Sequence, residues 1–448
     1  MIASSETGLA AGAAGDFRRR HRFASPAIEE IREQAFERFA AGGWPGPHDE
    51  EWRHTNVASI VELPFRPLDG APVSVPEELA AAARAIGEHP RLVFSDGRYV
   101  PSLSRPELAA GIRFSSLRDA SAAEPASIAG VLARRIAGES AFTLLNTAHL
   151  SDGAVIDVPD GTVLREPLHL LFHASGEDAR HASGGGPPPA IFPRNVIRLG
   201  RNAGATVLIA WAGRGRSLTS TVTQIALGEN SALELVNFQR QAAEAFHVAA
   251  LDVEQQRSSR FVSHLFSMGG AAARDEIHAR LGGEGTDCWL NGLFLTDGDQ
   301  RADLRTVVDH AVPHGTSRQT YRGILDGRSR ASFTGRVIVR AGAQKTDALQ
   351  SNKNLLLSRE ALVNSTPQLE IRANDVKCKH GSTTGQLDAD ALFYLRSRGL
   401  SAEAARSLLT YAFASDLVLR VPAALRGAVD RALHEKLPQA PSIFEIAK

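Results

Sequence analysis

Residues 199–207 read LGRNAGATV, and residues 227–235 repeat the pattern as LGENSALEL. Each stretch places Gly and Asn in a short polar turn before a run typical of a β-strand. Similar short Gly-containing sequences recur at residues 283–285 and 326–328. A sequence repeat with the length of one supersecondary unit indicates a solenoid, in which each repeat forms one turn, or rung, of a stack. The sequence therefore predicts a parallel β-helix. A sandwich of paired sheets is the alternative, because its strands and turns are equally short.

The pattern of apolar and turn-forming residues changes twice along the sequence, which predicts three domains. Residues 1–145 are mixed but mostly helical, residues 146–386 alternate short β-type runs with Gly, Asn and Asp, and residues 387–448 are helical again. The predicted fold is therefore mainly β, with a β-helix core between N-terminal and C-terminal α-helical domains. A Gly- and Pro-rich stretch at 178–189 predicts a flexible loop grafted onto the core.

Helix starts are marked by capping residues in both flanking regions. Ser25 followed by Pro26 predicts an N-cap with proline in the first turn. Near the other end, Asp388 and Ser401 cap two predicted helices, and Pro422 opens a third. This C-terminal unit is too small to form a large core alone, so we expect it to pack on the solenoid.

Composition excludes several classes of function. Fifty basic and fifty acidic residues cancel, which argues against a nucleic-acid partner, because such proteins carry a basic excess. The chain lacks the run of about 18 apolar residues that a membrane span needs. Two cysteines are too few for a disulfide framework, and the first residues lack an apolar signal core, so we expect a cytoplasmic protein.

The clearest chemical motif is DVKCKHG at residues 375–381, which places Cys378 and His380 two residues apart. In a strand these side chains leave the same face, while Lys377 and Lys379 point the other way. A thiolate and an imidazole suit zinc, iron or an iron-sulfur cluster, and the adjacent lysines predict a lowered thiol pKa. Because such sites want about four donors, the remaining donors must come from elsewhere, and another chain is one source.

Other readings of the chemistry stay open from the residues alone. Cys378 and His380 are equally compatible with a small core residue and a satisfied polar group. A cysteine-nucleophile enzyme is disfavoured, since neighbours at i,i+2 point in parallel. A carbohydrate-active β-helix enzyme is the main alternative function, but it needs two clustered carboxylates, and no such spacing stands out.

Three further motifs are expected to carry no chemistry. His310 and His314 have the i,i+4 spacing of a helical metal pair, but Pro313 and the strand-rich context argue against a helix there. Cys288 sits among large apolar neighbours and is expected in the core. Residues 342–346 (GAQKT) only faintly resemble a phosphate loop, so we expect no ATP hydrolysis by this chain.

Seven stretches of the sequence carry a resemblance to a known family. They are EWR at 51–53, YRGIL at 321–325, AQKTDALQSNKNLLLS at 343–358, PQLEI at 367–371, KCKH at 377–380, GQLD at 385–388 and ALFYLRSRG at 391–399. Together they resemble the SufB/SufD family, the scaffold subunits of the SUF iron-sulfur cluster assembly system. The KCKH stretch is closer to the SufD branch, since SufB proteins typically carry Glu-His-Glu there. The resemblance covers most of the chain and is densest between residues 282 and 399.

The resemblance implies a fold and a set of partners. It implies a right-handed parallel β-helix that pairs with a SufB-like subunit and docks onto a SufC-like ABC-type ATPase. His380 would then face a cysteine of the SufB-like subunit where the nascent cluster is built, with Cys378 close by in a role that stays open. The C-terminal helices would engage the ATPase. The docking residues we expect are Leu392, Leu395, Leu408, Leu409 and Phe413.

The resemblance also implies a non-catalytic scaffold with no cofactor of its own. An iron-sulfur cluster would be present transiently at the interface with the partner subunit. The sequence does not decide whether a flavin binds the assembled complex, or whether isolated chains pair as homodimers.

Overall fold

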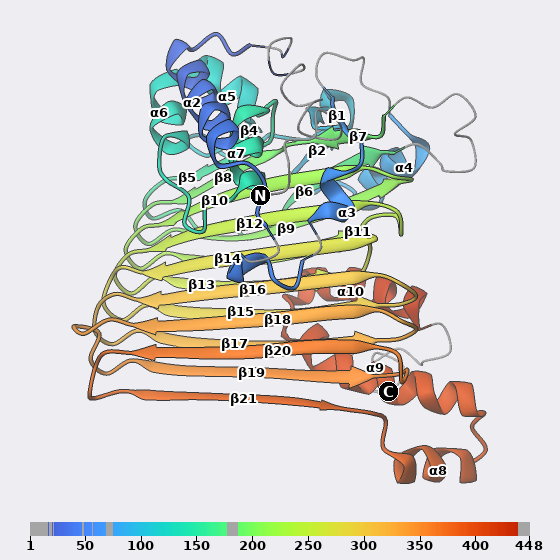
Figure 1. Cartoon of the computed structure of the whole chain (residues 1–448). Coiled ribbons are helices and arrows are strands. Elements are labelled where there is room, and N and C mark those ends of the chain that lie inside the picture. The colour runs from blue at the N-terminus through green and yellow to red at the C-terminus, as the bar shows by residue number, and fades with distance from the viewer. Residues whose placement is uncertain are drawn as a thin grey trace.

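The computed structural model describes residues 17, 20, 22–46, 49–55, 57–68, 75–176 and 187–437. Its body is a stack of parallel strands in two sheets, with helices over the N-terminal end and along one wall towards the C-terminal end (Figure 1). A mainly β fold with helical flanks is therefore confirmed.

The first sheet has 11 strands in the described part of the chain, and the second sheet has 10. The first contains β1 (Arg66–Pro67), β4 (Arg113–Ser116), β5 (Ala154–Val158), β7 (Pro189–Ile191), β8 (Arg194–Leu199), β10 (Leu218–Leu227), β12 (Phe246–Gln255), β14 (Ala272–Leu281), β16 (Arg301–His310), β18 (Arg330–Val339) and β20 (Leu362–Ile371). The second contains β2 (Arg91–Ser95), β3 (Arg98–Tyr99), β6 (Leu168–Ser175), β9 (Gly204–Arg214), β11 (Ala232–Arg240), β13 (Arg260–Ser267), β15 (Asp287–Thr296), β17 (Thr316–Leu325), β19 (Asp347–Leu356) and β21 (Lys377–Gly385).

The chain alternates between the sheets, so each rung contributes one strand to each. From β8 to β21 every strand pairs in parallel with the equivalent strand of the next rung, as in β10 with β12 and β11 with β13. A sandwich would be built from antiparallel pairs. The predicted parallel β-helix is confirmed and the sandwich alternative is wrong.

The sequence echo marks one stacked turn. Asn202 and Asn230 occupy the left-handed region, at φ 54° and 55°, in successive turns from the first sheet to the second. Asn230 Nδ2 donates to Asn202 Oδ1 at 2.7 Å, and Ser258 and Gly285 continue the stack. Asn tolerates this conformation better than most residues, which explains the repeat. The echo at 326–328 belongs to the opposite edge, between β17 and β18.

Apolar side chains from both sheets fill most of the solenoid interior. Phe172 stacks on Trp211 with ring centroids 4.3 Å apart, and Cys288 is fully buried in the same core, as predicted. Each large side chain buried in this way contributes about 1.5–3 kcal/mol. The core therefore runs continuously through the rungs.

Helices cover the N-terminal end of the solenoid. The first begins at Pro26 after Ser25, as the sequence predicted. The helices of this region are α2 (Pro26–Gly42), α3 (Ala58–Val61), α4 (Glu77–Ala85), α5 (Leu117–Ala123), α6 (Pro125–Leu132) and α7 (Ala141–Ala148), with 3-10 turns at Glu50–Trp52 and Pro101–Leu103. Because β1 to β4 join the two sheets, this region and the solenoid share one framework.

A buried arginine fastens the N-terminal segment to the solenoid wall. The Arg274 guanidinium lies 3.8 Å from the Trp52 ring centroid, and its Nη2 donates to the Glu51 carbonyl at 3.0 Å. Its charge is balanced by Glu276 and Asp303. In the stretch 51–53, which resembles the SufB/SufD family, Glu51 and Trp52 therefore have a structural role, since both contact Arg274.

Three helices follow the solenoid: α8 (Ala389–Ser397), α9 (Ala402–Arg420) and α10 (Ala423–Lys436). The Asp388 and Ser401 side chains cap α8 and α9 as predicted. Apolar residues of α9 and α10 pack against outward side chains of the second sheet. Figure 1 shows α8 projecting beyond β21.

Two expectations fall partly or wholly outside these observations. Most of the predicted loop at 178–189 lies outside the described residues, and β7 begins at its last position. The domain boundaries at 145/146 and 386/387 stay a prediction. In the described part of the chain, no helix is long and apolar enough to cross a membrane.

Asp275 gives the solenoid a pH-dependent stability. Burial raises its pKa from 3.8 to about 7; the Ser267 hydroxyl offsets part of this effect, and the Asp303 carboxylate adds to it. The folded state therefore retains a proton that the unfolded state releases, and the free energy of unfolding falls as pH rises from about 4 to about 7. We expect Asp275→Asn to be more stable than wild type, with an advantage about 3 kcal/mol larger at pH 8 than at pH 5. Urea denaturation of both proteins at the two pH values measures this difference. An equal advantage at both would contradict it.

Candidate functional site

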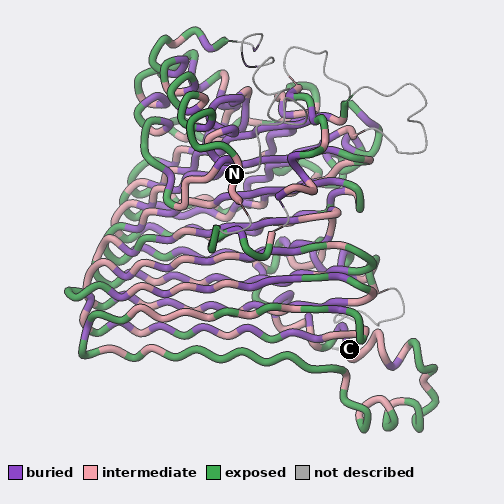
Figure 2. Tube along the Cα trace, in the orientation of Figure 1, coloured by how far each residue is buried: buried purple, intermediate pink, exposed green. Residues whose placement is uncertain are grey.

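The last rung leaves both sheets unpaired on one side. The strands β20 and β21 are the terminal strands of the two sheets, and each pairs only with its counterpart in the preceding rung. We call this edge, residues 362–371 and 377–385, the open end. Figure 2 shows β21 exposed along nearly its whole length, in contrast to the strands above it. An unpaired edge of this length is a template for another chain.

Cys378 and His380 lie on β21 and face the solenoid interior. Cys378 is in register with Ala348, and His380 is in register with Gln350, whose side chain is buried inside the solenoid. Because side chains in register on neighbouring strands share a face, the thiol and the imidazole are directed to the same side, as predicted. Cys378 is half-buried against an apolar cluster, whereas His380 is exposed.

The thiol is less acidic than the sequence suggested. Burial raises the pKa of Cys378, and the Asp347 carboxylate raises it further; a hydrogen bond with the Ala348 backbone offsets part of the effect. The prediction that Lys377 and Lys379 lower this pKa is wrong, because both lysines project from the opposite face of the strand.

A polar network crosses the open end beside these residues. Ser382 Oγ donates to Ser365 Oγ at 2.8 Å, and Ser365 Oγ donates to Asn352 Oδ1 at 2.8 Å. Asn354 Nδ2 donates to the same oxygen at 2.7 Å. Three strands are thus joined by side-chain hydrogen bonds where an apolar core would otherwise meet water.

Other predicted residues stay apart from Cys378 and His380. His310 is buried and bonded to Ser317 Oγ at 2.9 Å, and burial lowers its pKa to about 4, while His314 lies in a left-handed turn. A Cβ at Gly315 would lie 2.7 Å from His310 Nδ1. Cys288 shares a register column with Cys378, three strands away, but it is fully buried. Residues 342–346 form a turn between two strands, whereas a phosphate loop leads from a strand into a helix.

The donor set for a metal is incomplete within this chain. Among the described residues, no group of three or more His, Cys, Asp or Glu side chains is placed to hold a metal ion. One thiol and one imidazole supply at most two of the roughly four ligands that zinc or cluster iron requires.

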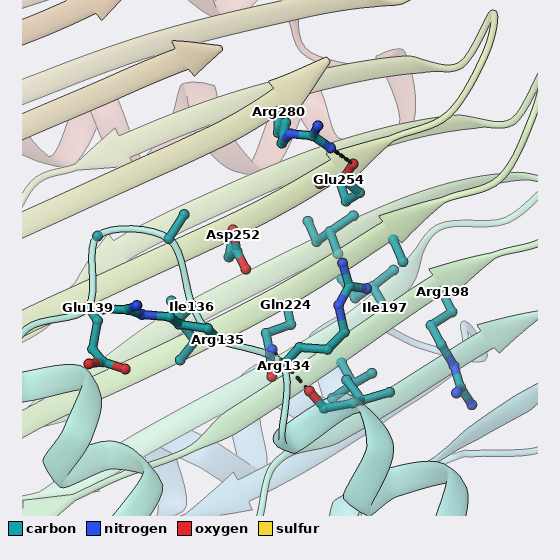
Figure 3. Close-up of a pocket in the computed structure, with 16 residues that line it drawn as sticks. Arg134, Arg135, Ile136, Glu139, Ile197, Arg198, Gln224, Asp252, Glu254 and Arg280 are labelled. Carbon is teal, nitrogen blue, oxygen red and sulfur yellow. Dashed lines mark hydrogen bonds and ion pairs between the residues drawn. The ribbon is translucent and has the colours of Figure 1, made fainter. Parts of the chain in front are cut away.

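A pocket of about 430 Å³ lies elsewhere, between the loop after α6 and the outer face of the first sheet (Figure 3). Three carboxylates line it, from Glu139, Asp252 and Glu254. The sequence analysis did not single out Asp252 and Glu254, although their i,i+2 spacing on β12 places them on one face of the strand. Glu254 is bonded to Arg280 at 2.7 Å, Asp252 accepts the Ala137 backbone N–H, and Glu139 is paired with Arg38. Burial raises the pKa of Asp252 to about 6. Since all three carboxylates have structural partners, the pocket gives little support to a carbohydrate-active enzyme.

The helical residues expected to dock an ATPase are half-buried. They are Leu392, Leu395, Leu408, Leu409 and Phe413. The most exposed large apolar side chains of this region are instead Phe393 and Tyr394 of α8, at 75% and 56%. The sequence contained a signal for them, since they lie on α8 between Leu392 and Leu395.

The fold and the site define a β-helical protein with an unpaired edge that carries a thiol and an imidazole on one face. A family model described as the SUF system FeS cluster assembly SufBD core domain matches residues 181–413, and one for the SufBD protein N-terminal region matches residues 19–170. The chain belongs to the SufBD family of iron-sulfur cluster assembly proteins.

Relatives match along most of their length. An iron-sulfur cluster assembly SufBD family protein of Synechocystis is 32% identical over 86% of this chain and 85% of its own. The iron-sulfur cluster assembly protein SufD of Escherichia coli is 30% identical over 86% and 87%, and a SufBD family protein of Mycobacterium bovis is 27% identical over 88% and 90%. The resemblance drawn from the sequence motifs is confirmed.

The raised thiol pKa predicts slow alkylation. At pH 8, iodoacetamide should modify Cys378 more slowly than the same cysteine in the unfolded chain, because only the thiolate reacts. Asp347→Asn should accelerate the reaction and Lys379→Gln should leave it within about twofold, while Cys288 reacts only after denaturation. Peptide mass spectrometry over time follows both cysteines. A marked slowing in Lys379→Gln would restore the lysine explanation.

Proposed function

We propose that this chain is a non-catalytic scaffold subunit that pairs through its open end with a SufB-like subunit. The observation that carries the proposal is the conjunction of two unpaired edge strands with an incomplete donor pair on one of them. A second chain that extends the sheets would satisfy the backbone groups and place its own side chains beside Cys378 and His380.

In this proposal the nascent iron-sulfur cluster is cargo assembled at the shared interface. His380 is the better placed ligand, because it is exposed on the edge strand. A neutral imidazole binds borderline metals such as iron through one ring nitrogen. Cys378 is half-buried with a raised pKa, so it needs the electrostatic effect of a bound metal to ionise. No cofactor is proposed on the isolated chain, and a flavin on the complex stays an open expectation.

We further propose that the C-terminal helices dock a SufC-like ABC-type ATPase. The helix α8 has no buried side chain and carries Phe393 and Tyr394 in the open. Exposed aromatic side chains beside apolar neighbours favour a protein interface. The half-buried leucines of α8 and α9 would support this surface from beneath. Without the SufB-like partner, the open end would be available to a second copy of this chain.

Removal of the imidazole tests the site. We expect His380→Ala to fold and to co-purify with the SufB-like subunit, since His380 is exposed, but to lower cluster loading at least tenfold. Affinity purification from native cells, followed by iron and acid-labile sulfide analysis, measures both properties. Unchanged iron and sulfide on an intact complex would exclude His380 from cluster assembly, and the absence of the partner from wild-type preparations would contradict the scaffold proposal.

Charge on the exposed aromatic residues tests ATPase docking. The double variant Phe393→Glu with Tyr394→Glu should keep the wild-type melting temperature but release the ATPase, because two carboxylates cannot be desolvated in an apolar interface. Val163→Glu is the matched control, since Val163 is 67% exposed at the other end of the molecule. Co-purification measured against the retained SufB-like subunit gives the result. ATPase retained by the double variant would place docking elsewhere.

A further inference from the structure

Two buried amides, Gln319 and Gln350, stack in register inside the solenoid next to the open end. Thr306 Oγ1 donates to Gln319 Oε1 at 2.6 Å, and Gln350 Nε2 donates to the same oxygen at 3.3 Å. All three residues are about 1% exposed. The next residue in register after Gln350 is His380.

The Gln350 amide is confined on two sides. Its Nε2 donates to Gln319 Oε1, and it occupies space that exists because residue 335 on the facing sheet is a glycine. A Cβ at Gly335 would lie 1.9 Å from Gln350 Nε2. In this arrangement Gln319 Nε2 is also without a partner among the described residues, and the Gln350 oxygen is the group left to interact with the last rung.

That oxygen has no hydrogen-bond partner among the described residues, although it is buried. Buried polar atoms are nearly always hydrogen-bonded. An unpaired acceptor next to an interface therefore indicates that its donor is supplied when the interface forms. The neighbouring strand is about 4.8 Å away and its inward side chain at this position is the imidazole of His380. In the isolated chain that imidazole is exposed and can be hydrated.

We propose that Gln350 is the positioning residue for His380, accepting a ring N–H through Oε1 once a partner covers the open end. Covering the end removes water from the imidazole, and Gln350 Oε1 becomes the fixed acceptor within reach. In a neutral imidazole one nitrogen donates and the other keeps its lone pair, so this bond selects the tautomer that presents a free nitrogen to iron. The inference rests on the proposed function, because it concerns the same interface.

The test uses the complex of this chain with its co-purified partners. We expect Gln350→Met, which keeps the volume but loses the acceptor, to raise the ferrous iron needed for half-maximal loading by roughly 10–100-fold under anaerobic reconstitution with sulfide. Gln350→Glu keeps an acceptor and should restore loading to within a few fold of wild type. In the complex labelled with ¹⁵N-histidine in this chain, the His380 ring should show one tautomer in wild type and a mixture in Gln350→Met.

A matched control separates positioning from a general loss of packing. Gln255 is fully buried in an earlier rung and bonded to Ser259, so Gln255→Met removes a similar amide far from the site and should leave loading and tautomer unchanged. If Gln350→Met does not fold, Gly335→Ala gives the same test, since the added methyl displaces the amide while Gln350 remains.

The outcomes distinguish the two proposals. If His380→Ala leaves loading intact, the proposed function of this site fails. If His380→Ala abolishes loading while Gln350→Met keeps both wild-type loading and a single His380 tautomer, the scaffold proposal stands and the role of Gln350 is overturned.

Discussion

The structure depends on one constraint, the in-register ladder of backbone hydrogen bonds that joins each rung to the next. Once the strands are parallel and unshifted, each residue type repeats above its equivalent, so the turns, the interior columns and the outer rows all follow from the same pairing. The constraint also has a necessary consequence at the ends. A ladder that stops leaves a row of unsatisfied N–H and C=O groups, and here it stops at β20 and β21.

The interior changes character as it approaches that edge. Aromatic and aliphatic side chains dominate the middle rungs, where Gln255 and Asp275 are the exceptions named above, whereas the last rungs gather Gln319, Gln350, Asn352 and Asn354. Amides and hydroxyls bond to one another and to water, so the end of the stack can be wet without a large loss of stability. The same groups become costly if they are covered without partners. A chain that caps this end must therefore match them, which favours a specific partner over an arbitrary apolar surface.

Local sequence signals were sufficient to predict the turns and the helix starts, but they were not sufficient to predict the pKa of the candidate thiol. The turn echo at Asn202 and Asn230 and the caps at Asp388 and Ser401 predicted features that depend on a few neighbouring residues. The acidity of Cys378 depends on Asp347, thirty-one positions earlier in the chain and adjacent only through strand pairing. The prediction that the adjacent lysines lower the pKa of Cys378 was wrong, because side chains alternate along a strand and sequence neighbours therefore lie on opposite faces.

The same distinction separates the site residues that could be predicted from those that could not. Cys378 and His380 were visible as a motif, because two ligand-type side chains on one strand need no tertiary information. Gln350 was not, since its importance arises from a glycine on the facing sheet and a register that no spacing encodes. The clamp around Arg274 is similar, as it brings together segments more than two hundred residues apart.

The joint between α8 and α9 has a mechanical consequence. The helix α9 is fastened to the solenoid by Arg322 with Asp416 at 2.9 Å and by Arg406 with Asp326 at 3.0 Å. The helix α8 lies between Gly399, a glycine at φ 95°, and the short linker 386–388 that joins it to β21. A load applied to α9 would pass into the wall of the β-helix through its ion pairs. A load applied to α8 would swivel it at Gly399 and be transmitted along the linker to β21, so the two helices deliver force to different parts of the β-helix.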